Sequence, residues 1–154
     1  MEDPDNAGVI APPPLIFLTA LTASSLLTRI VDRPFLPERF CRVCGLGCIA
    51  AGAACAGSAA VAMRRHKTSI DPYEPTAAVV QSGIFARTRN PIYLGMIAAY
   101  VGVSLLQRSL LPLVGLTFAL PMIERGVIAR EERYLERRFG DAYRTYREAV
   151  PRWL

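Results

Sequence analysis

Residues 43–63 read VCGLGCIAAGAACAGSAAVAM, a run of 21 residues without a charged side chain. At about 1.5 Å of rise per residue, a helix of this length crosses the roughly 30 Å hydrocarbon core of a bilayer. The run is rich in Ala, Gly and Ser, and small side chains let helix backbones approach closely in lipid. We therefore expect a membrane-spanning helix that packs tightly against other helices.

Three further apolar runs flank this segment. Residues 15–31 hold Arg29 as their only charge, and residues 92–106 are separated from residues 110–123 by three polar residues. The last two runs are short for single spans and together predict a tight helical hairpin. The expected fold is all-α, an integral membrane bundle of about four transmembrane helices. We divide it into residues 1–65, with two spans, and residues 66–154, with the hairpin and an amphipathic tail.

The composition agrees with a membrane protein. Apolar residues make up 52% of the 154-residue chain, and the mean hydropathy is +0.27. These values exclude a disordered chain and are unusual for a soluble domain. The formal net charge of +5 suits an anionic partner, which could be a membrane surface, a nucleic acid or an acidic metabolite.

The distribution of basic residues predicts the orientation. With four spans, the N-terminus, residues 64–91 and the tail beyond residue 123 share one side, and they hold 13 of the 18 Lys and Arg residues. This side is expected to be the cytoplasm, because basic residues are enriched in cytoplasmic loops. The acidic residues Glu2, Asp3 and Asp5 do not fit a secretory signal peptide, which begins with positive charge.

Four cysteines lie within fifteen residues, at positions that place them near one stripe of a helix: Cys41, Cys44, Cys48 and Cys55. Metal and iron–sulfur sites usually take ligands from a loop or from several elements. Reduced cysteines instead behave as small apolar residues suited to a close helix interface. We expect packing and no metal site, with metal or redox chemistry as the alternative. His66 is expected to be an interfacial basic residue.

Polar residues that could carry chemistry gather in residues 66–95 and 124–154. Arg87 and Arg89 precede Pro91, which can begin the next apolar helix. Positive charge at this place also fits simple anchoring of the helix at the membrane surface. These arginines therefore do not by themselves identify a site.

The tail has the pattern of an amphipathic helix. Its apolar residues recur at helical spacing from Ile128 to Val150, Gly140 interrupts it, and Pro151 ends it. Glu131 falls on the apolar stripe, three residues after Ile128, whereas Glu132 is rotated about 100° toward the polar face. A carboxylate on a buried face needs a partner, because burying it alone is costly. Glu131 is therefore a candidate site residue.

Two motifs resemble a known family of membrane enzymes. Residues 82–95, SGIFARTRNPIYLG, are similar to the S-G-x-Y-x-x-x-R-H-P-x-Y-x-G signature of the isoprenylcysteine carboxyl methyltransferases. Residues 131–151, EERYLERRFGDAYRTYREAVP, are similar to the E-E-x-x-L-x-x-x-F-G-x-x-Y-x-x-Y-x-x-x-V-P of the same family. These proteins and the related phospholipid methyltransferases are integral membrane enzymes, and the resemblance covers about residues 66–151.

The resemblance implies transfer of a methyl group from S-adenosyl-L-methionine to a lipophilic or membrane-embedded acceptor. It also implies a cofactor pocket at the cytoplasmic end of the last two helices, with cofactor-binding residues Ala77, Ala78, Val79, Val80, Phe85, Asn90, Pro91, Ile92, Tyr93 and Glu131. The role of Glu131 agrees with the separate argument from helical spacing. Arg89 is expected to be a catalytic residue that holds the carboxylate of the cofactor, since a guanidinium pairs well with it.

Three positions depart from the family pattern. Asn90 stands where the family has histidine, Phe85 stands where it has tyrosine, and Val127 stands where it has a substrate-binding arginine. Arg125 and Arg130 are the candidates to replace that arginine as catalytic residues.

Two other functions remain open from the sequence. The R-x-P-x-Y-x-G and F-G-x-x-Y patterns also resemble those of NADPH-dependent membrane sterol and steroid reductases, although Met96 stands where that family has glutamate. A non-enzymatic membrane protein would have a tail that coats the bilayer and a fully solvated Glu131. A nucleic-acid partner is not expected, because acidic residues are interleaved with the arginines of the tail.

Overall fold

The computed structural model describes residues 6–31 and 37–154, and this part of the chain is helical and contains no strand. The α-helices are α1 (Pro13–Val31), α2 (Glu38–Arg65), α3 (Pro91–Leu106), α4 (Leu111–Ile123), α5 (Ala129–Phe139) and α6 (Asp141–Ala149). A 3-10 turn, η1 (Gly83–Ala86), precedes α3, and a π-helical segment, η2 (Glu124–Ile128), joins α4 to α5. The predicted all-α fold is confirmed. Glu2, Asp3 and Asp5, on which the prediction about a signal peptide rests, lie outside the described residues.

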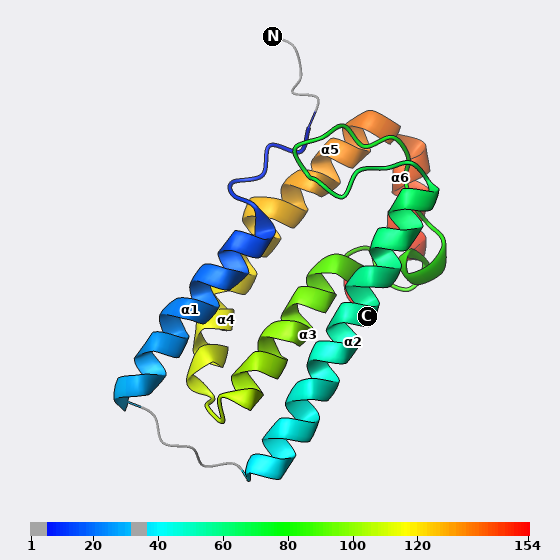
Figure 1. Cartoon of the computed structure of the whole chain (residues 1–154). Coiled ribbons are helices and arrows are strands. Elements are labelled where there is room, and N and C mark those ends of the chain that lie inside the picture. Colours follow the sequence, from blue (N-terminus) through cyan, green and yellow to red (C-terminus); the bar gives the residue numbers. More distant parts are fainter. Residues whose placement is uncertain (1–5, 32–36) are drawn as a thin grey trace.

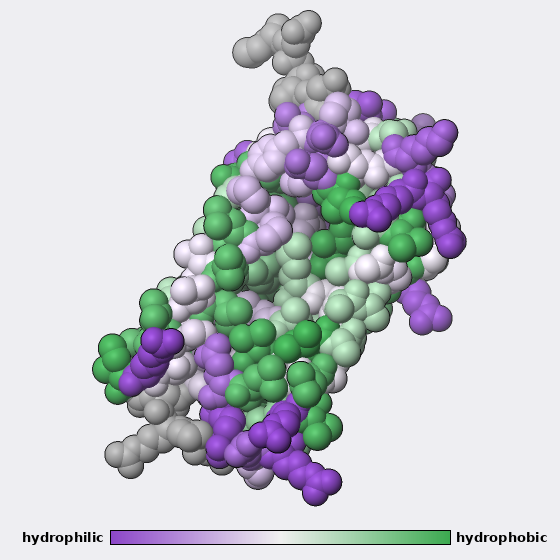
Figure 2. Space-filling view, in the orientation of Figure 1, coloured by the Kyte–Doolittle hydropathy of each residue, from purple (hydrophilic) through white to green (hydrophobic). Residues whose placement is uncertain are grey.

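The first four helices run side by side, with the remaining elements gathered at one end (Figure 1). The short α3–α4 turn lies at the opposite end, together with the last turn of α1 and the first turn of α2. The end away from this turn holds residues 6–12, residues 66–90, α5 and α6. The predicted hairpin requires residues 66–90 and the tail to lie at the same end. Hydrophilic side chains gather at the two ends, and a largely apolar band lies between them (Figure 2).

Three helical stretches are long and apolar enough to cross a membrane: Pro13–Ile30, Glu38–Arg65 and Leu111–Phe139. The third joins α4, η2 and α5 into 29 residues. The chain is therefore an integral membrane protein. Helix α3, with 16 residues, is shorter than these and covers only about 24 Å at the usual rise. The expected count of four full spans is not confirmed, and the proposed division at residue 65 remains a prediction.

Glycines set the packing of α2 against α3. A Cβ atom built on Gly52 would lie 2.5 Å from the carbonyl oxygen of Gly95, and one on Gly45 would lie 2.8 Å from that of Gly102. The two pairs are seven residues apart on each helix, so they lie on one side of each helix. This confirms the predicted close packing of residues 43–63, although the helix begins earlier, at Glu38.

The four cysteines all lie on α2. Cys41 is buried, and the thiol of Cys55 donates a hydrogen bond to the carbonyl oxygen of Pro91 at 3.2 Å. All four cysteines are free thiols. Within residues 6–31 and 37–154, no group of three or more His, Cys, Asp or Glu residues is placed to hold a metal ion. The burial of Cys41 and the hydrogen bond of Cys55 to Pro91 fit the packing interpretation.

The N-terminal segment folds back onto η2. The backbone N–H of Ile10 donates to the carbonyl oxygen of Gly126 at 3.2 Å, and the Ile10 side chain fills the space beside that glycine. A Cβ on Gly126 would lie 2.3 Å from Ile10 Cδ1. Gly140, at φ +53°, separates α5 from α6, at the position where the tail was expected to break. These turns bring distant segments to one end of the bundle.

Candidate active site

A cavity of about 150 Å³ lies at the end of the molecule where the tail helices gather. Its walls come from residues 68–80, the start of α3, and α5 and α6. The segment over the cavity is fixed by Thr68 and Thr76. Thr68 Oγ1 accepts the backbone N–H of Ala78 at 3.0 Å, and the N–H of Thr76 donates to the hydroxyl of Tyr134 at 3.1 Å. The first bond closes residues 68–78 into a loop, and the second ties this loop to α5.

Glu131 and Tyr93 meet in the wall of this cavity. The Tyr93 hydroxyl donates to Glu131 Oε1 at 2.6 Å, and the Tyr93 side chain is buried. No other hydrogen bond to the Glu131 carboxylate is found within the part of the chain that the structure describes. Pro91 begins α3 two residues before Tyr93, and this places Tyr93 in the first turn, facing α5. Glu131 thus keeps capacity to bind a further donor or a cation.

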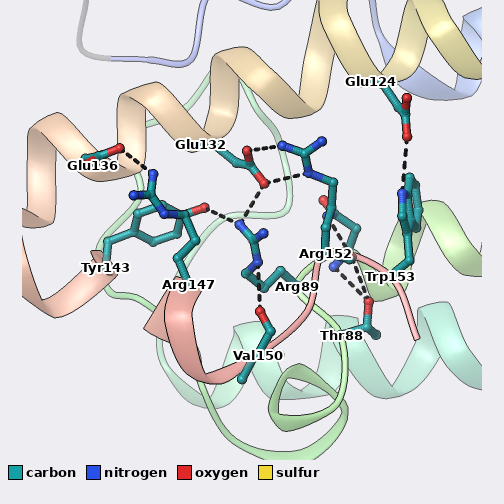
Figure 3. Close-up of polar contacts among 11 residues, drawn as sticks. Thr88, Arg89, Glu124, Glu132, Glu136, Tyr143, Arg147, Val150, Arg152 and Trp153 are labelled. Carbon is teal, nitrogen blue, oxygen red and sulfur yellow. Dashed lines mark hydrogen bonds and ion pairs between the residues drawn. The ribbon is translucent and has the colours of Figure 1, made fainter. Parts of the chain in front are cut away.

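Glu132 also faces inward, which corrects its expected place on the polar face. Its Oε1 accepts Arg89 Nη1 at 2.7 Å, and Arg152 donates to both oxygens, at 3.0 and 2.6 Å (Figure 3). The side chains of Arg89 and Glu132 are 11% and 15% exposed, so water screens their attraction only partly. The helical spacing could not show this, because residues 150–153 cover the side of α5 that carries Glu132.

Arg89 is held by several groups at once. Its Nε donates to the carbonyl oxygen of Val150 at 3.0 Å, and its Nη1 also donates to the hydroxyl of Tyr143 at 3.3 Å (Figure 3). Burial raises the pKa of Tyr143 above its ordinary value, and the carboxylate of Glu132 raises it further. The hydrogen bond to Glu132 raises the pKa of Arg152. Tyr143 thus stays a neutral hydroxyl and Arg152 a cation at ordinary pH.

The charges around the cavity favour cations. Among the described lining residues, Asp71, Glu131 and Glu132 carry carboxylates, and Arg89 carries the positive charge. Because Arg89 is already paired with Glu132, no basic residue in the described part of the wall neutralises the charges of Asp71 and Glu131. Apolar side chains, including Val79, complete the surface.

Residues 40–142 match the phospholipid methyltransferase family. The chain belongs to the phospholipid methyltransferase family. The match contains the loop over the cavity, Tyr93 and Glu131, and it confirms the resemblance seen in the sequence motifs. It does not favour an NADPH-dependent reductase or a non-enzymatic membrane protein.

A relative in Haemophilus influenzae, described as an uncharacterized protein, is 38% identical over 63 residues. The aligned region is 41% of this chain and 100% of the relative. No solved structure matches the chain.

Most residues expected to bind the cofactor line the cavity of this phospholipid methyltransferase family member. They are Ala78, Val79, Val80, Phe85, Asn90, Pro91, Ile92, Tyr93 and Glu131, together with the expected catalytic residue Arg89. Ala77 is exposed and lies outside the lining. Asn90 lines the cavity, but its amide Nδ2 donates to the carbonyl oxygen of Arg152 at 3.0 Å. Part of its role is therefore to hold the backbone.

Arg125 and Arg130 are not brought to the cavity. Both are exposed and absent from its lining. Arg130 Nη1 donates to the carbonyl oxygen of Gly8 at 2.7 Å, so it holds the N-terminal segment. The expectation that either arginine replaces the family's substrate-binding arginine has no support in this geometry, because the adjoining Val127 and Ile128 take the buried side of the helix.

Several lining residues were not singled out as site residues from the sequence. They are Ala7, Thr68, Asp71, Thr76, Glu132, Tyr134, Tyr143 and Tyr146. Tyr143 and Tyr146 had a signal, since both lie on the apolar stripe of the tail. Their hydroxyls then bond inward, and that of Tyr146 donates to the carbonyl oxygen of Phe85 at 2.8 Å. Thr68 and Ala7 carry no signal, because only the folded chain brings them to the cavity.

Proposed function

We propose that this protein transfers a methyl group from S-adenosylmethionine to a lipophilic or membrane-embedded acceptor, with the cofactor in the cavity beside Glu131. The observation that carries the proposal is the Tyr93–Glu131 pair, at 2.6 Å, in the cavity of a phospholipid methyltransferase family member. Family membership supports the reaction class, and the residues at the cavity support the cofactor.

The charges of the cavity fit this cofactor. S-adenosylmethionine carries a sulfonium, an ammonium and a carboxylate, which give it a net charge of +1, and the wall offers more carboxylates than cations. Apolar residues such as Val79 and Phe85 can cover the adenine. The cavity is smaller than the roughly 300–1,000 Å³ of most ligand sites. A nucleoside cofactor therefore requires an outward shift of the segment that carries Thr68 and Thr76, or it extends beyond the cavity.

The protein's contribution to the reaction is binding and alignment. When bound, the cofactor supplies an electrophilic methyl group on a positively charged sulfur. Glu131 would bind the ammonium or a ribose hydroxyl, and the Tyr93 hydroxyl fixes the orientation of that carboxylate. Because holding two reactants in line removes much of the entropic barrier, little acid–base work is required of the protein.

The acceptor is proposed to enter from the bilayer. The cavity lies at the polar end of apolar helices, at the start of α3, so an amphiphile could place its polar group there while its apolar part stays in lipid. The excess of basic residues on this side favours a cytoplasmic site.

Labelled methyl transfer into a membrane lipid extract, followed by identification of the product, tests the proposal. Incorporation of label into a lipid-soluble product that depends on the purified protein is expected. Methylation of fully water-soluble acceptors alone, with no competition by lipidic ones, would contradict lateral entry. Absence of any transfer and of any cofactor binding would contradict the function.

A further inference from the structure

The segment Val150–Trp153 forms a strap across the site, and each of its four residues is hydrogen-bonded to another segment of the chain. The carbonyl oxygens of Val150 and Pro151 accept Arg89 Nε and the Arg89 backbone N–H, each at 3.0 Å. The carbonyl oxygen of Arg152 accepts both Thr88 Oγ1 and Asn90 Nδ2, again at 3.0 Å. The strap therefore fixes the three residues that precede α3.

The side chains of Arg152 and Trp153 reach α5 and η2, on the other side of the strap from α3 (Figure 3). Arg152 grips Glu132 through two nitrogens, in the bidentate geometry that makes guanidinium–carboxylate pairs strong. Trp153 Nε1 donates to Glu124 Oε1 in η2 at 3.2 Å. One short segment thus joins the start of α3 to α5 and to the π-helical segment.

Arg152 does not line the cavity, but it touches residues that do. With Arg152 present, Glu132 is paired with two guanidinium groups, and Glu131 is the neighbouring carboxylate that remains open to a ligand cation. Without it, Glu132 would keep a single partner and would compete with Glu131 for that cation. Arg89 and Asn90 would also lose the backbone acceptors that hold them if the strap moved.

We propose that Arg152 is a positioning residue for cofactor binding, acting through Glu132, Arg89 and Asn90. The strap lies beyond residues 40–142, the part of the chain matched to the family. The inference rests on the proposed function, since it assumes that the cavity holds S-adenosylmethionine. It assigns to Arg152 an effect on cofactor affinity that is separate from its effect on stability.

Titration of S-adenosylhomocysteine into the detergent-solubilised protein tests this inference. Arg152→Gln should raise the Kd about tenfold, which corresponds to about 1.4 kcal/mol. Arg152→Lys should recover part of the affinity, because an ammonium keeps the charge but not the bidentate geometry. Arg147→Gln is the matched control: Arg147 pairs with Glu136 and, like Arg152, does not line the cavity, and its loss should change the Kd by less than about twofold.

The double variant Glu132→Gln/Arg152→Gln separates positioning from general destabilisation. Because both residues act through one pair, its Kd should be raised by clearly less than the product of the two single effects. A Kd within twofold of wild type in both Arg152 variants would overturn the inference, even if their melting temperatures fall. If Arg152→Gln does not fold, an unchanged Kd in Arg152→Lys overturns it. Failure of the wild-type protein to bind contradicts the proposed function instead.

Discussion

Glu131 and Glu132 are adjacent carboxylates with different partners. Glu131 accepts one hydroxyl, from Tyr93, whereas Glu132 is gripped by Arg89 and Arg152. The first is therefore suited to bind a ligand, and the second is suited to hold the site together. The two residues should respond differently to loss of their partners.

Tyr93→Phe should weaken binding of S-adenosylhomocysteine by about twofold to tenfold, because a single hydrogen bond contributes about 0.5–1.5 kcal/mol. The change removes the hydroxyl that orients Glu131 and keeps the ring that packs in the wall. Isothermal titration in detergent measures the effect. Tyr100→Phe is the control, since the Tyr100 hydroxyl bonds to the carbonyl oxygen of Pro112, away from the cavity. Equal losses in both variants would contradict a specific role for Tyr93.

Glu132→Gln should destabilise the fold by about 1–3 kcal/mol, because two guanidinium groups lose a charged and mostly buried partner. For a domain of this size, the melting temperature should fall by about 2–12 °C. Glu136→Gln is the matched control on the same helix. Its pairs with Arg144 and Arg147 are more exposed and should contribute less than about 1 kcal/mol. A larger fall in melting temperature for Glu136→Gln than for Glu132→Gln would show that the ion pairs of Glu132 are not the more stabilising ones.

The sequence could identify Glu131 but not the function of Glu132. Spacing from Ile128 located the buried stripe of α5, and it placed Glu131 correctly. The argument from spacing assumed that only one face of α5 is covered, whereas the strap Val150–Trp153 covers a second face. For a similar reason the sequence offered Arg130 as a candidate catalytic residue, whereas its side chain donates to the carbonyl oxygen of Gly8, which is distant in the chain. Periodicity reports the faces of a helix, and it does not report which distant segment lies on each face.

At the scale of elements, the contact between α2 and α3 depends on glycines that could be foreseen as a group. The density of small residues in residues 43–63 predicted close packing, and the pairing of Gly52 with Gly95 shows where it occurs. The hairpin and the break at Gly140 were also predictable, because short polar turns and Gly mark helix ends. The π-helical segment η2 was not, because no residue pattern distinguishes it from a continuing α-helix.

Gly52→Ala should lower stability by about 1–3 kcal/mol, because the added Cβ would lie 2.5 Å from the carbonyl oxygen of Gly95 and the helices must move apart. Gly57→Ala, on the same helix, meets no atom within 4 Å and should be neutral or stabilising by up to about 1 kcal/mol. Thermal unfolding of both variants in one detergent gives the comparison. An unchanged melting temperature for Gly52→Ala would contradict the close helix contact.

At the scale of the whole molecule, the segments that line the cavity gather at one end, which is the proposed functional end. Residues 6–12, residues 66–90 and the tail helices meet there, and the α3–α4 turn lies at the other end (Figure 1). The functional end also carries most of the basic residues. Since basic residues favour the cytoplasm, the cavity should open on the cytoplasmic side.

Fusion of a fluorescent protein after Leu154 tests this orientation in a bacterial inner membrane. A reporter that folds only in the cytoplasm should be fluorescent there, because the tail belongs to the basic end. The same reporter inserted at Arg108, in the α3–α4 turn, should be dark. The reverse pattern would place the cavity outside and contradict the cytoplasmic assignment.

The central claim is that the cavity beside Glu131 binds S-adenosylmethionine, and titration of S-adenosylhomocysteine into the wild-type protein and Glu131→Gln tests it most directly. We predict saturable binding to the wild type and a tenfold to hundredfold higher Kd in the variant. The reason is that a hydrogen bond to a charged group contributes about 1.5–3 kcal/mol. The melting temperature should change little, since Glu131 has a single hydrogen-bond donor in the described structure. NADPH should not compete. Equal affinities of wild type and variant, or displacement by NADPH, would contradict the account.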